Sequence, residues 1–183
     1  MLKRRNAETD GDVLDASATR RSAERTAAYV ALGANLGDRE ANIERAVLTL
    51  DDHPGIAVVA RAALYETEPV GGPAGQPPYL NTAVGIDTTL PARDLLAICL
   101  RIEADLGRVR TVPNAARTID IDLLLYGDAV IDRPGLRVPH PRMHLRRFVL
   151  DPLAEIAGDV IHPTLRRTIA DLLAKKRGHS TFS

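Results

Sequence analysis

The chain has 183 residues, which is enough for one domain with a substantial hydrophobic core. Basic and acidic residues balance at 24 each, so no net charge favours nucleic acid or an anionic membrane as a partner. The sequence contains no apolar run of about 18 residues, the length expected of a membrane span. A single cysteine, Cys99, excludes a disulfide within the chain. The single thiol fits a reducing compartment, so we expect a cytoplasmic protein, and we treat it as a monomer.

Three regions follow from composition along the chain. Residues 1–27 are polar, mixed in charge and without apolar periodicity, which predicts a disordered N-terminal extension. The acidic residues of this region argue against a targeting peptide. A single domain is predicted over residues 28–174, followed by a short C-terminal tail at 175–183.

The domain alternates between strand and helix patterns in the order strand, helix, strand, strand, helix, strand. Strands are expected at 29–32, 56–65, 79–88 and 118–126. Helices are expected after Asp38 and after Pro91, and two short helices at 148–157 and 165–174. Asp38 can cap the first helix, in which Ile43, Ala46, Val47 and Leu50 follow helical spacing. This order is that of the ferredoxin-like fold. We therefore predict an α+β domain with an antiparallel sheet and helices on one face.

Two long loops interrupt this pattern, at 66–78 and at 108–116. The first contains four prolines and three glycines. Loops of this length are unusual within a compact domain and are often functional.

The last predicted strand of the sheet carries two aspartates, Asp120 and Asp122. Side chains alternate along a strand, so four aliphatic residues are expected together on the core face: Ile119, Ile121, Leu123 and Leu125. The two aspartates then share the opposite face, with Cβ atoms roughly 6–7 Å apart. Aspartate is disfavoured within strands, and paired carboxylates bind hard divalent cations. The alternative is an ordinary strand with a solvated polar face.

Basic residues bracket this acidic strand on both sides. Arg108, Arg110 and Arg117 precede it, whereas His140, Arg142 and Arg146 follow it. Isolated arginines are commonly solvated, but carboxylates, metals and arginines together are what phosphoryl transfer requires. Neither a G-x-x-x-x-G-K-[ST] motif nor a G-x-G-x-x-G motif is present, which argues against P-loop and Rossmann nucleotide sites.

Few aromatic residues are available to bind a flat ligand. Tyr79 follows a proline pair at the start of a predicted strand, and Phe148 follows the downstream arginines. Each residue could belong to the core or could stack against a heterocycle. Asn81 points to the same face as Tyr79, and its amide can both donate and accept hydrogen bonds.

Six stretches of the chain together carry a family resemblance. They are Ala31-Leu-Gly-Ala-Asn-Leu-Gly37, Tyr65-Glu-Thr-Glu-Pro-Val-Gly71, Pro78-Tyr-Leu-Asn81, Glu103 with Gly107-Arg-Val-Arg110, Arg117-Thr-Ile-Asp-Ile-Asp122, and Val138-Pro-His140 through Phe148. In this order the chain resembles the 6-hydroxymethyl-7,8-dihydropterin pyrophosphokinase family of the folate pathway, over roughly residues 28–160.

The resemblance implies a ferredoxin-like fold and a reaction with ATP as co-substrate. The hydroxymethyl oxygen of the pterin would attack the β-phosphorus of ATP and release AMP. Two Mg²⁺ ions would be held by Asp120 and Asp122, and the implied catalytic residues are these two aspartates with Arg108 and Arg117. The implied ATP site comprises Glu103, Arg108, Arg110, Arg117, His140 and Arg146. The implied pterin site comprises Thr67, Val70, Tyr79, Asn81 and Phe148.

The chain departs from the family in the loop before the aspartates. Many members read Trp-Gly-Pro-Arg or Asn-Ala-Pro-Arg there, but this chain reads Asn114-Ala-Ala-Arg117, with Pro113 where a basic residue is common. Two other functions remain open. One is a non-catalytic ferredoxin-like ligand-binding module, because a fold does not fix a function. The other is a different metal-dependent nucleotidyl or phosphoryl transferase.

Overall fold

Five strands form one antiparallel sheet in the computed structural model, which describes residues 24–108 and 115–178. They are β1 (Thr26–Ala34), β2 (Ile56–Arg61), β3 (Tyr65–Thr67), β4 (Tyr79–Thr88) and β5 (Asp120–Tyr126). Four strands lie in the order β2-β4-β1-β5, and the short β3 also pairs with β4. With its two crossover helices this is the ferredoxin-like topology, which confirms the predicted fold class.

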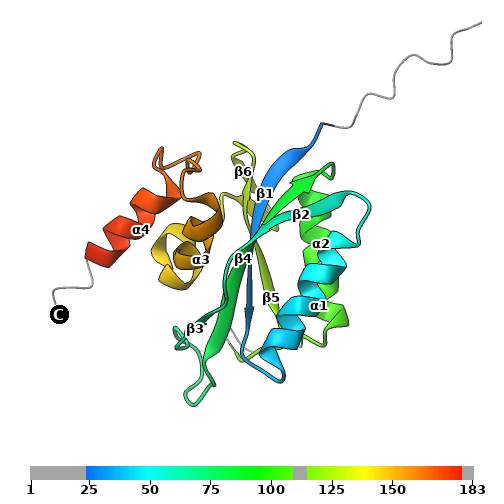
Figure 1. Cartoon of the computed structure of the whole chain (residues 1–183), viewed down its shortest axis with the longest axis vertical. Coiled ribbons are helices and arrows are strands. Elements are labelled where there is room, and N and C mark those ends of the chain that lie inside the picture. The colour runs from blue at the N-terminus through cyan, green and yellow to red at the C-terminus, as the bar shows by residue number, and fades with distance from the viewer. Residues whose placement is uncertain (1–23, 109–114, 179–183) are drawn as a thin grey trace, which may run out of the picture.

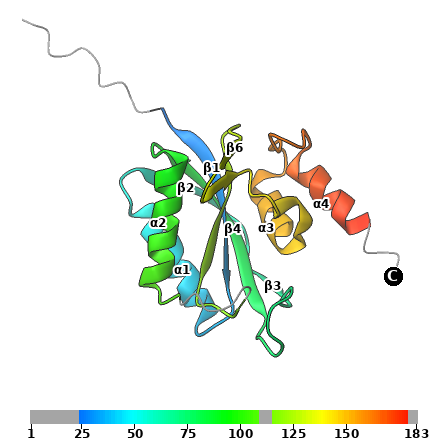
Figure 2. The same cartoon turned by 180° about the vertical axis from the view of Figure 1, so that it is seen from behind.

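Helices cover both faces of this sheet (Figures 1 and 2). Helices α1 (Arg39–Asp51) and α2 (Ala92–Asp105) lie on one face, where they contact β1, β2, β4 and β5. Helix α3 (Arg147–Ala157) packs against β4 from the other side, and α4 (Ile169–Gly178) packs on α3. The prediction of helices on one face therefore holds for α1 and α2 only. No helix in the described part of the chain is long and apolar enough to cross a membrane.

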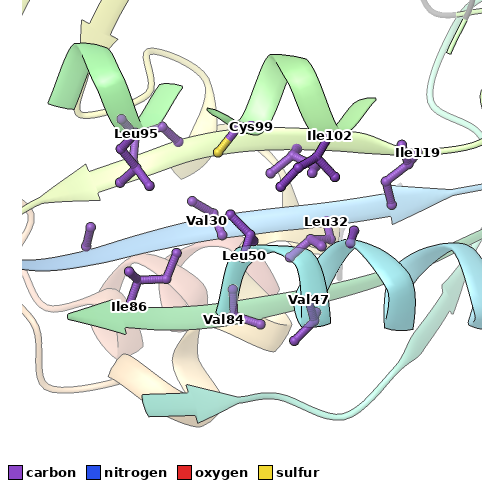
Figure 3. Close-up of a cluster of buried hydrophobic side chains, with 14 of the residues drawn as sticks. Val30, Leu32, Val47, Leu50, Val84, Ile86, Leu95, Cys99, Ile102 and Ile119 are labelled. Carbon is purple, nitrogen blue, oxygen red and sulfur yellow. The ribbon is translucent and has the colours of Figure 1, made fainter. Parts of the chain in front are cut away.

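The core under α1 and α2 follows from the apolar spacing of both helices. In α1, Ile43, Ala46, Val47 and Leu50 are buried, which is the one-face pattern of an amphipathic helix. Asp38 caps this helix as predicted, since its side chain accepts a hydrogen bond from the Ala41 N–H at 3.0 Å. Figure 3 shows Val47 and Leu50 of α1 together with Leu95, Cys99 and Ile102 of α2 in one buried cluster with side chains of the sheet.

Burial makes the Cys99 thiol unreactive. Its side chain is fully buried, and burial together with the charge of Glu103 raises its pKa to about 12. Because the thiolate is the nucleophile, we expect no alkylation of the folded protein by iodoacetamide at pH 8, and complete alkylation in denaturant. Mass spectrometry measures both, and rapid labelling of the folded protein would contradict the burial of Cys99.

A bulge in β5 changes which residues reach the second face. Leu123 faces Val30, whereas Leu125 faces the adjacent Tyr29, so β5 has one extra residue at this point. A bulge reverses the alternation of the side chains that follow it. Leu125 therefore joins Leu124 in the cluster beneath α3, and the prediction that it shares a face with Ile121 is wrong.

Several helix and strand boundaries in the structure also differ from the predicted ones. Thr26 and Ala27 belong to β1, and α4 extends to Gly178, so both ends of the folded domain lie outside the predicted limits. Within the predicted loop at 66–78, Glu66 and Thr67 belong to β3. The proline- and arginine-rich segment after β5 contains an unpredicted hairpin of β6 (Ile131–Arg133) and β7 (Leu136–Val138). Residues 1–23 and most of the predicted loop at 108–116 lie outside the described residues.

A buried histidine links the chain before α4 to the short 3₁₀ helix η1 (Met143–Leu145). His162 is only 4% exposed, and its ring meets that of His144 edge to face. Its Nδ1 accepts a hydrogen bond from the Leu165 N–H at 3.2 Å. Burial lowers the pKa of His162, and His144 acts in the same direction.

This lowered pKa predicts a loss of stability in acid. The unfolded chain takes up a proton near pH 6.5 that the folded chain binds only at lower pH, so the free energy of unfolding falls as the pH drops below about 6.5. Urea unfolding at about pH 7.5 and pH 5.5 should show a smaller loss for His162→Gln than for the parent protein. Equal losses in the two proteins would contradict the prediction.

Candidate active site

Small residues in the central strand β1 separate two groups of polar side chains. Gly33 lies between Asp120 on β5 and Asn81 on β4, and Ala31 lies beside Asp122. A Cβ atom at Gly33 would stand 3.0 Å from the Asn81 Oδ1, closer than side chains normally pack. The sheet therefore brings the predicted metal carboxylates and the predicted pterin amide onto one face.

Both oxygens of Asp120 are held by arginines. Arg108 Nη1 donates to Asp120 Oδ1 at 2.5 Å, and Arg117 Nη1 donates to Asp120 Oδ2 at 2.7 Å. The two arginine side chains are only 13% and 15% exposed, so these charged pairs are poorly screened by solvent. An incoming phosphate could replace this carboxylate as the hydrogen-bond acceptor of both arginines.

Asp122 is neutralised less completely than Asp120. Its Oδ2 lies 3.9 Å from His140 Nε2 and 3.8 Å from Arg146 Nη1, which are longer than hydrogen bonds. Burial raises the pKa of the Asp122 carboxyl, the charge of Asp120 raises it further, and His140, Arg146 and Arg108 oppose this. A divalent cation would relieve the repulsion between the two carboxylates.

The donor set fits a hard cation that keeps other ligands. Within residues 24–108 and 115–178, no group of three or more His, Cys, Asp or Glu side chains could hold a metal by itself. Two carboxylates that leave the remaining ligands to substrate phosphates and water are typical of Mg²⁺ sites. The arrangement therefore suits Mg²⁺ that arrives with a nucleotide.

A backbone contact sets the tautomer of His140. The Arg142 N–H donates to His140 Nδ1 at 3.2 Å, which leaves the proton of the neutral ring on Nε2, facing Asp122. Burial lowers the pKa of His140, and Arg146 and Arg142 act in the same direction, whereas Asp122 opposes the shift. His140 can thus serve as a neutral hydrogen-bond donor at neutral pH.

Glu103 lies behind the site. It is only 2% exposed, and its Oε1 accepts hydrogen bonds from the Ile121 N–H at 2.8 Å and from Arg108. It lines neither cavity described below. The resemblance implies that Glu103 belongs to the ATP site, which stays a prediction; in the structure Glu103 holds Arg108 and the strand between the two aspartates.

A cavity of about 470 Å³ collects the remaining predicted residues between the sheet and the segment from Arg142 to Val149. Its walls include all five predicted pterin residues, namely Thr67, Val70, Tyr79, Asn81 and Phe148. They also include most predicted phosphate and metal residues, namely Arg108, Arg117, Asp120, Asp122, His140 and Arg146. Arg110, Pro113 and Asn114 lie outside the described residues.

A second cavity of about 560 Å³ was not predicted from the sequence. Leu96 of α2, Leu123 of β5 and Leu136 of the β6–β7 hairpin contribute apolar walls. Asp122 and His140 line this cavity as well as the first. The site therefore consists of two cavities that meet at one carboxylate and one imidazole.

Asn35 is a further residue that the sequence interpretation missed. It is 2% exposed, and its Oδ1 accepts a hydrogen bond from the Arg117 N–H at 2.8 Å. Its Nδ2 donates to the Pro77 carbonyl at 3.2 Å. Asn35 thereby ties Arg117 to the segment that leads into Tyr79. Its place in the matched stretch that ends at Gly37 was the available signal.

Comparison with known proteins finds one family over most of the chain. The family model described as 7,8-dihydro-6-hydroxymethylpterin-pyrophosphokinase (HPPK) matches residues 29–158. The 2-amino-4-hydroxy-6-hydroxymethyldihydropteridine pyrophosphokinase of Bacillus subtilis is 47% identical over 133 residues, covering 73% of this chain and 79% of its own. The enzyme of the same name from Methylorubrum extorquens is 48% identical over 149 residues, covering 80% and 94%.

Solved structures share the fold at low identity. An HPPK-DHPS structure in complex with substrates superposes with a TM-score of 0.67 at 13% identity, over 87% of this chain and 45% of that chain. Plasmodium falciparum wild-type HPPK-DHPS gives a TM-score of 0.66 at 16% identity, over 87% and 46%. This chain thus spans less than half of those solved chains.

The relatives of high identity are named pyrophosphokinases, which confirms the predicted transferase class and does not favour the non-catalytic module. The matched residues include both aspartates, His140 and Phe148. The chain therefore belongs to the 7,8-dihydro-6-hydroxymethylpterin-pyrophosphokinase family.

Proposed function

We propose that this chain transfers the pyrophosphoryl group of ATP to 6-hydroxymethyl-7,8-dihydropterin in folate biosynthesis, with Mg²⁺, and releases AMP. The observation that carries the proposal is the meeting of two cavities at Asp122 and His140. A transfer between two substrates requires that each has its own binding space and that both reach the same charged groups.

The pterin occupies the cavity with the aromatic residues. Tyr79 and Phe148 line it and offer their rings to a flat heterocycle. Asn81 donates to Thr67 Oγ1 at 2.8 Å, and within the described residues its Oδ1 receives no hydrogen bond. This oxygen is therefore available to accept a hydrogen bond from a pterin N–H group.

The nucleotide base and sugar occupy the second cavity, with its leucine walls. The triphosphate then extends past Asp122 and His140 toward the arginines of the first cavity. Arg108 and Arg117 exchange Asp120 for phosphate oxygens, and Arg146 turns from Asp122 in the same way. The His140 Nε2–H donates to a phosphate oxygen.

Asp120 and Asp122 would hold two Mg²⁺ ions, which would neutralise phosphate charge and lower the pKa of the substrate hydroxyl. The protein holds the hydroxymethyl oxygen in line with the β-phosphorus. The bond from this oxygen to the β-phosphorus forms as the bond from the β-phosphorus to the α,β-bridging oxygen breaks. The electron pair of the broken bond leaves with AMP, and the hydroxyl proton passes to solvent water. Arginines and His140 stabilise the charge that builds on the phosphate oxygens.

Nucleotide analysis tests this reaction. The folded protein is incubated with ATP, Mg²⁺ and the pterin alcohol, and the products are separated by ion-exchange chromatography. We expect AMP in amounts that match the pterin consumed, and none without the pterin or with EDTA. Release of ADP would indicate phosphoryl transfer, and release of pyrophosphate would indicate nucleotidyl transfer. No turnover by folded protein would support the non-catalytic module.

A further inference from the structure

The arginines that line the first cavity differ in whether they have a carboxylate partner. Arg108 and Arg117 hydrogen-bond to Asp120, and Arg146 lies near Asp122. Arg142 lines the same cavity. Its side chain forms no ion pair or hydrogen bond with any residue in the described parts of the chain. An arginine beside a charged site is thus left without a protein acceptor.

Arg142 also gives this part of the site an excess positive charge. The walls of the first cavity carry four arginines, Arg108, Arg117, Arg142 and Arg146, against three carboxylates, Glu68, Asp120 and Asp122, so the lining has one excess positive charge. Its charge lowers the pKa of Arg146 and of His140, which places it close enough to act on both. Like charges held close together without a protein counterion favour an anionic ligand.

The position of Arg142 indicates which part of the ligand it meets. Arg142 lines the cavity that contains Thr67, Asn81 and Phe148, and it does not line the second cavity. In the proposed reaction the β- and γ-phosphates pass from the nucleotide to the pterin, whereas the α-phosphate stays with AMP. An arginine on the pterin side of Asp122 is placed to meet the phosphates that move.

We propose that Arg142 is a further phosphate-binding residue, which contacts the two transferred phosphates of ATP and not the α-phosphate. The inference rests on the proposed function, because that reaction defines which phosphates are transferred. It assigns a ligand to the one arginine lining the first cavity that has no carboxylate partner among the described residues.

Calorimetric titration of two nucleotides tests the assignment. The probes are α,β-methylene-ATP, whose α,β-bridge cannot be cleaved, and AMP, each with Mg²⁺. Loss of one charge-assisted contact at an exposed position should weaken binding about tenfold. We therefore expect Arg142→Gln to bind the ATP analogue about tenfold more weakly and AMP with unchanged affinity. Arg142→Lys should recover part of the loss, because it keeps the charge without the planar fork.

Arg147→Gln is the matched control. Arg147 is exposed, pairs with Asp151 at 3.3 Å and lines neither cavity, so this change removes the same charge from the same segment. It should leave both affinities unchanged. An equal loss in this control would show a general effect of charge and would overturn the inference.

The remaining outcomes separate the inference from the proposed function. If the parent protein binds the analogue and Arg142→Gln binds it equally well, Arg142 is a solvated surface residue and only the inference fails. If Arg142→Gln lowers the affinity for AMP as much as the affinity for the ATP analogue, the assignment to the transferred phosphates is wrong. If the parent protein does not bind the analogue, the proposed function fails together with the inference.

Discussion

Asp122→Asn is expected to lower turnover by on the order of a thousandfold, because it removes a carboxylate that the account assigns to Mg²⁺ and to the charge balance of the reacting phosphates. The fold should survive. The pKa of Asp122 is raised by burial and by Asp120, so its charged form is disfavoured in the folded chain. Replacing the charge with a neutral amide should leave the free energy of unfolding unchanged or higher at neutral pH.

The sign of this effect can be checked with pH. A carboxyl with a raised pKa takes up its proton in the folded chain at a higher pH than in the unfolded chain, so the parent protein gains relative stability as the pH falls. The difference in unfolding free energy between the parent and Asp122→Asn should therefore shrink in acid. Steady-state kinetics and urea unfolding measure the two effects.

Asp128→Asn is the control for Asp122→Asn. Asp128 is exposed in the turn after β5 and lines neither cavity, so it reports the same chemical change outside the site. Its turnover and stability should match those of the parent protein. Turnover by Asp122→Asn within tenfold of the parent would contradict a metal-binding role for Asp122.

Glu103→Ala is expected to have the largest effect on stability among the site residues, about 3 kcal/mol. The substitution removes the acceptor of the buried Ile121 N–H and the buried partner of Arg108. Arg108 would then no longer be held beside Asp120, and affinity for ATP should fall as well. Urea unfolding and nucleotide titration report the two losses.

A second substitution separates the two tasks of Glu103. Glu103→Gln keeps an oxygen for the Ile121 N–H but removes the charge that faces Arg108. It should therefore lower the free energy of unfolding by about 1 kcal/mol less than Glu103→Ala does, and it should still weaken ATP binding. Asp105→Ala changes an exposed carboxylate of the same helix and should stay within about 0.5 kcal/mol of the parent. Equal stability of Glu103→Ala and Asp105→Ala would contradict the buried role of Glu103.

Sequence patterns predicted those features that depend on local periodicity. Alternation along the last strand of the sheet placed Asp120 and Asp122 on one face and Ile119 and Ile121 in the core, and the structure agrees. The order of strands and helices was sufficient to predict the ferredoxin-like topology. Helical spacing likewise predicted the buried face of α1.

Features that depend on tertiary packing could not be predicted from local sequence patterns. The bulge in β5 moved Leu125 to the second face, and the run Leu123-Leu124-Leu125 has no alternation from which the facing of each residue could be read. Helix α3, with α4 packed on it, covers the face that was expected to be open, because the apolar stripe of a helix alone does not specify a side of the sheet. Pairing partners such as Glu103 and Ile121 lie on different elements, so no local pattern joins them.

The second cavity was missed for a related reason. Its hairpin lies in a proline- and arginine-rich segment that resembles an irregular loop in sequence, and the turn between its strands relies on Gly135 at a φ of 78°. Only the folded chain brings Leu136 beside Leu96 and Leu123. The cavity proposed for the nucleotide base is thus formed by α2, β5 and the β6–β7 hairpin, which are distant in sequence.

The path of the β-phosphorus tests the central claim most directly. The folded protein is given ATP labelled with ³²P at the β-phosphate, together with Mg²⁺ and the pterin alcohol, and the pterin and nucleotide products are separated. The account predicts that the label leaves with the pterin, that AMP is unlabelled, and that Asp122→Asn abolishes the transfer. Label that remains in ADP, or that appears as free pyrophosphate while the pterin stays unmodified, would contradict pyrophosphoryl transfer at this site.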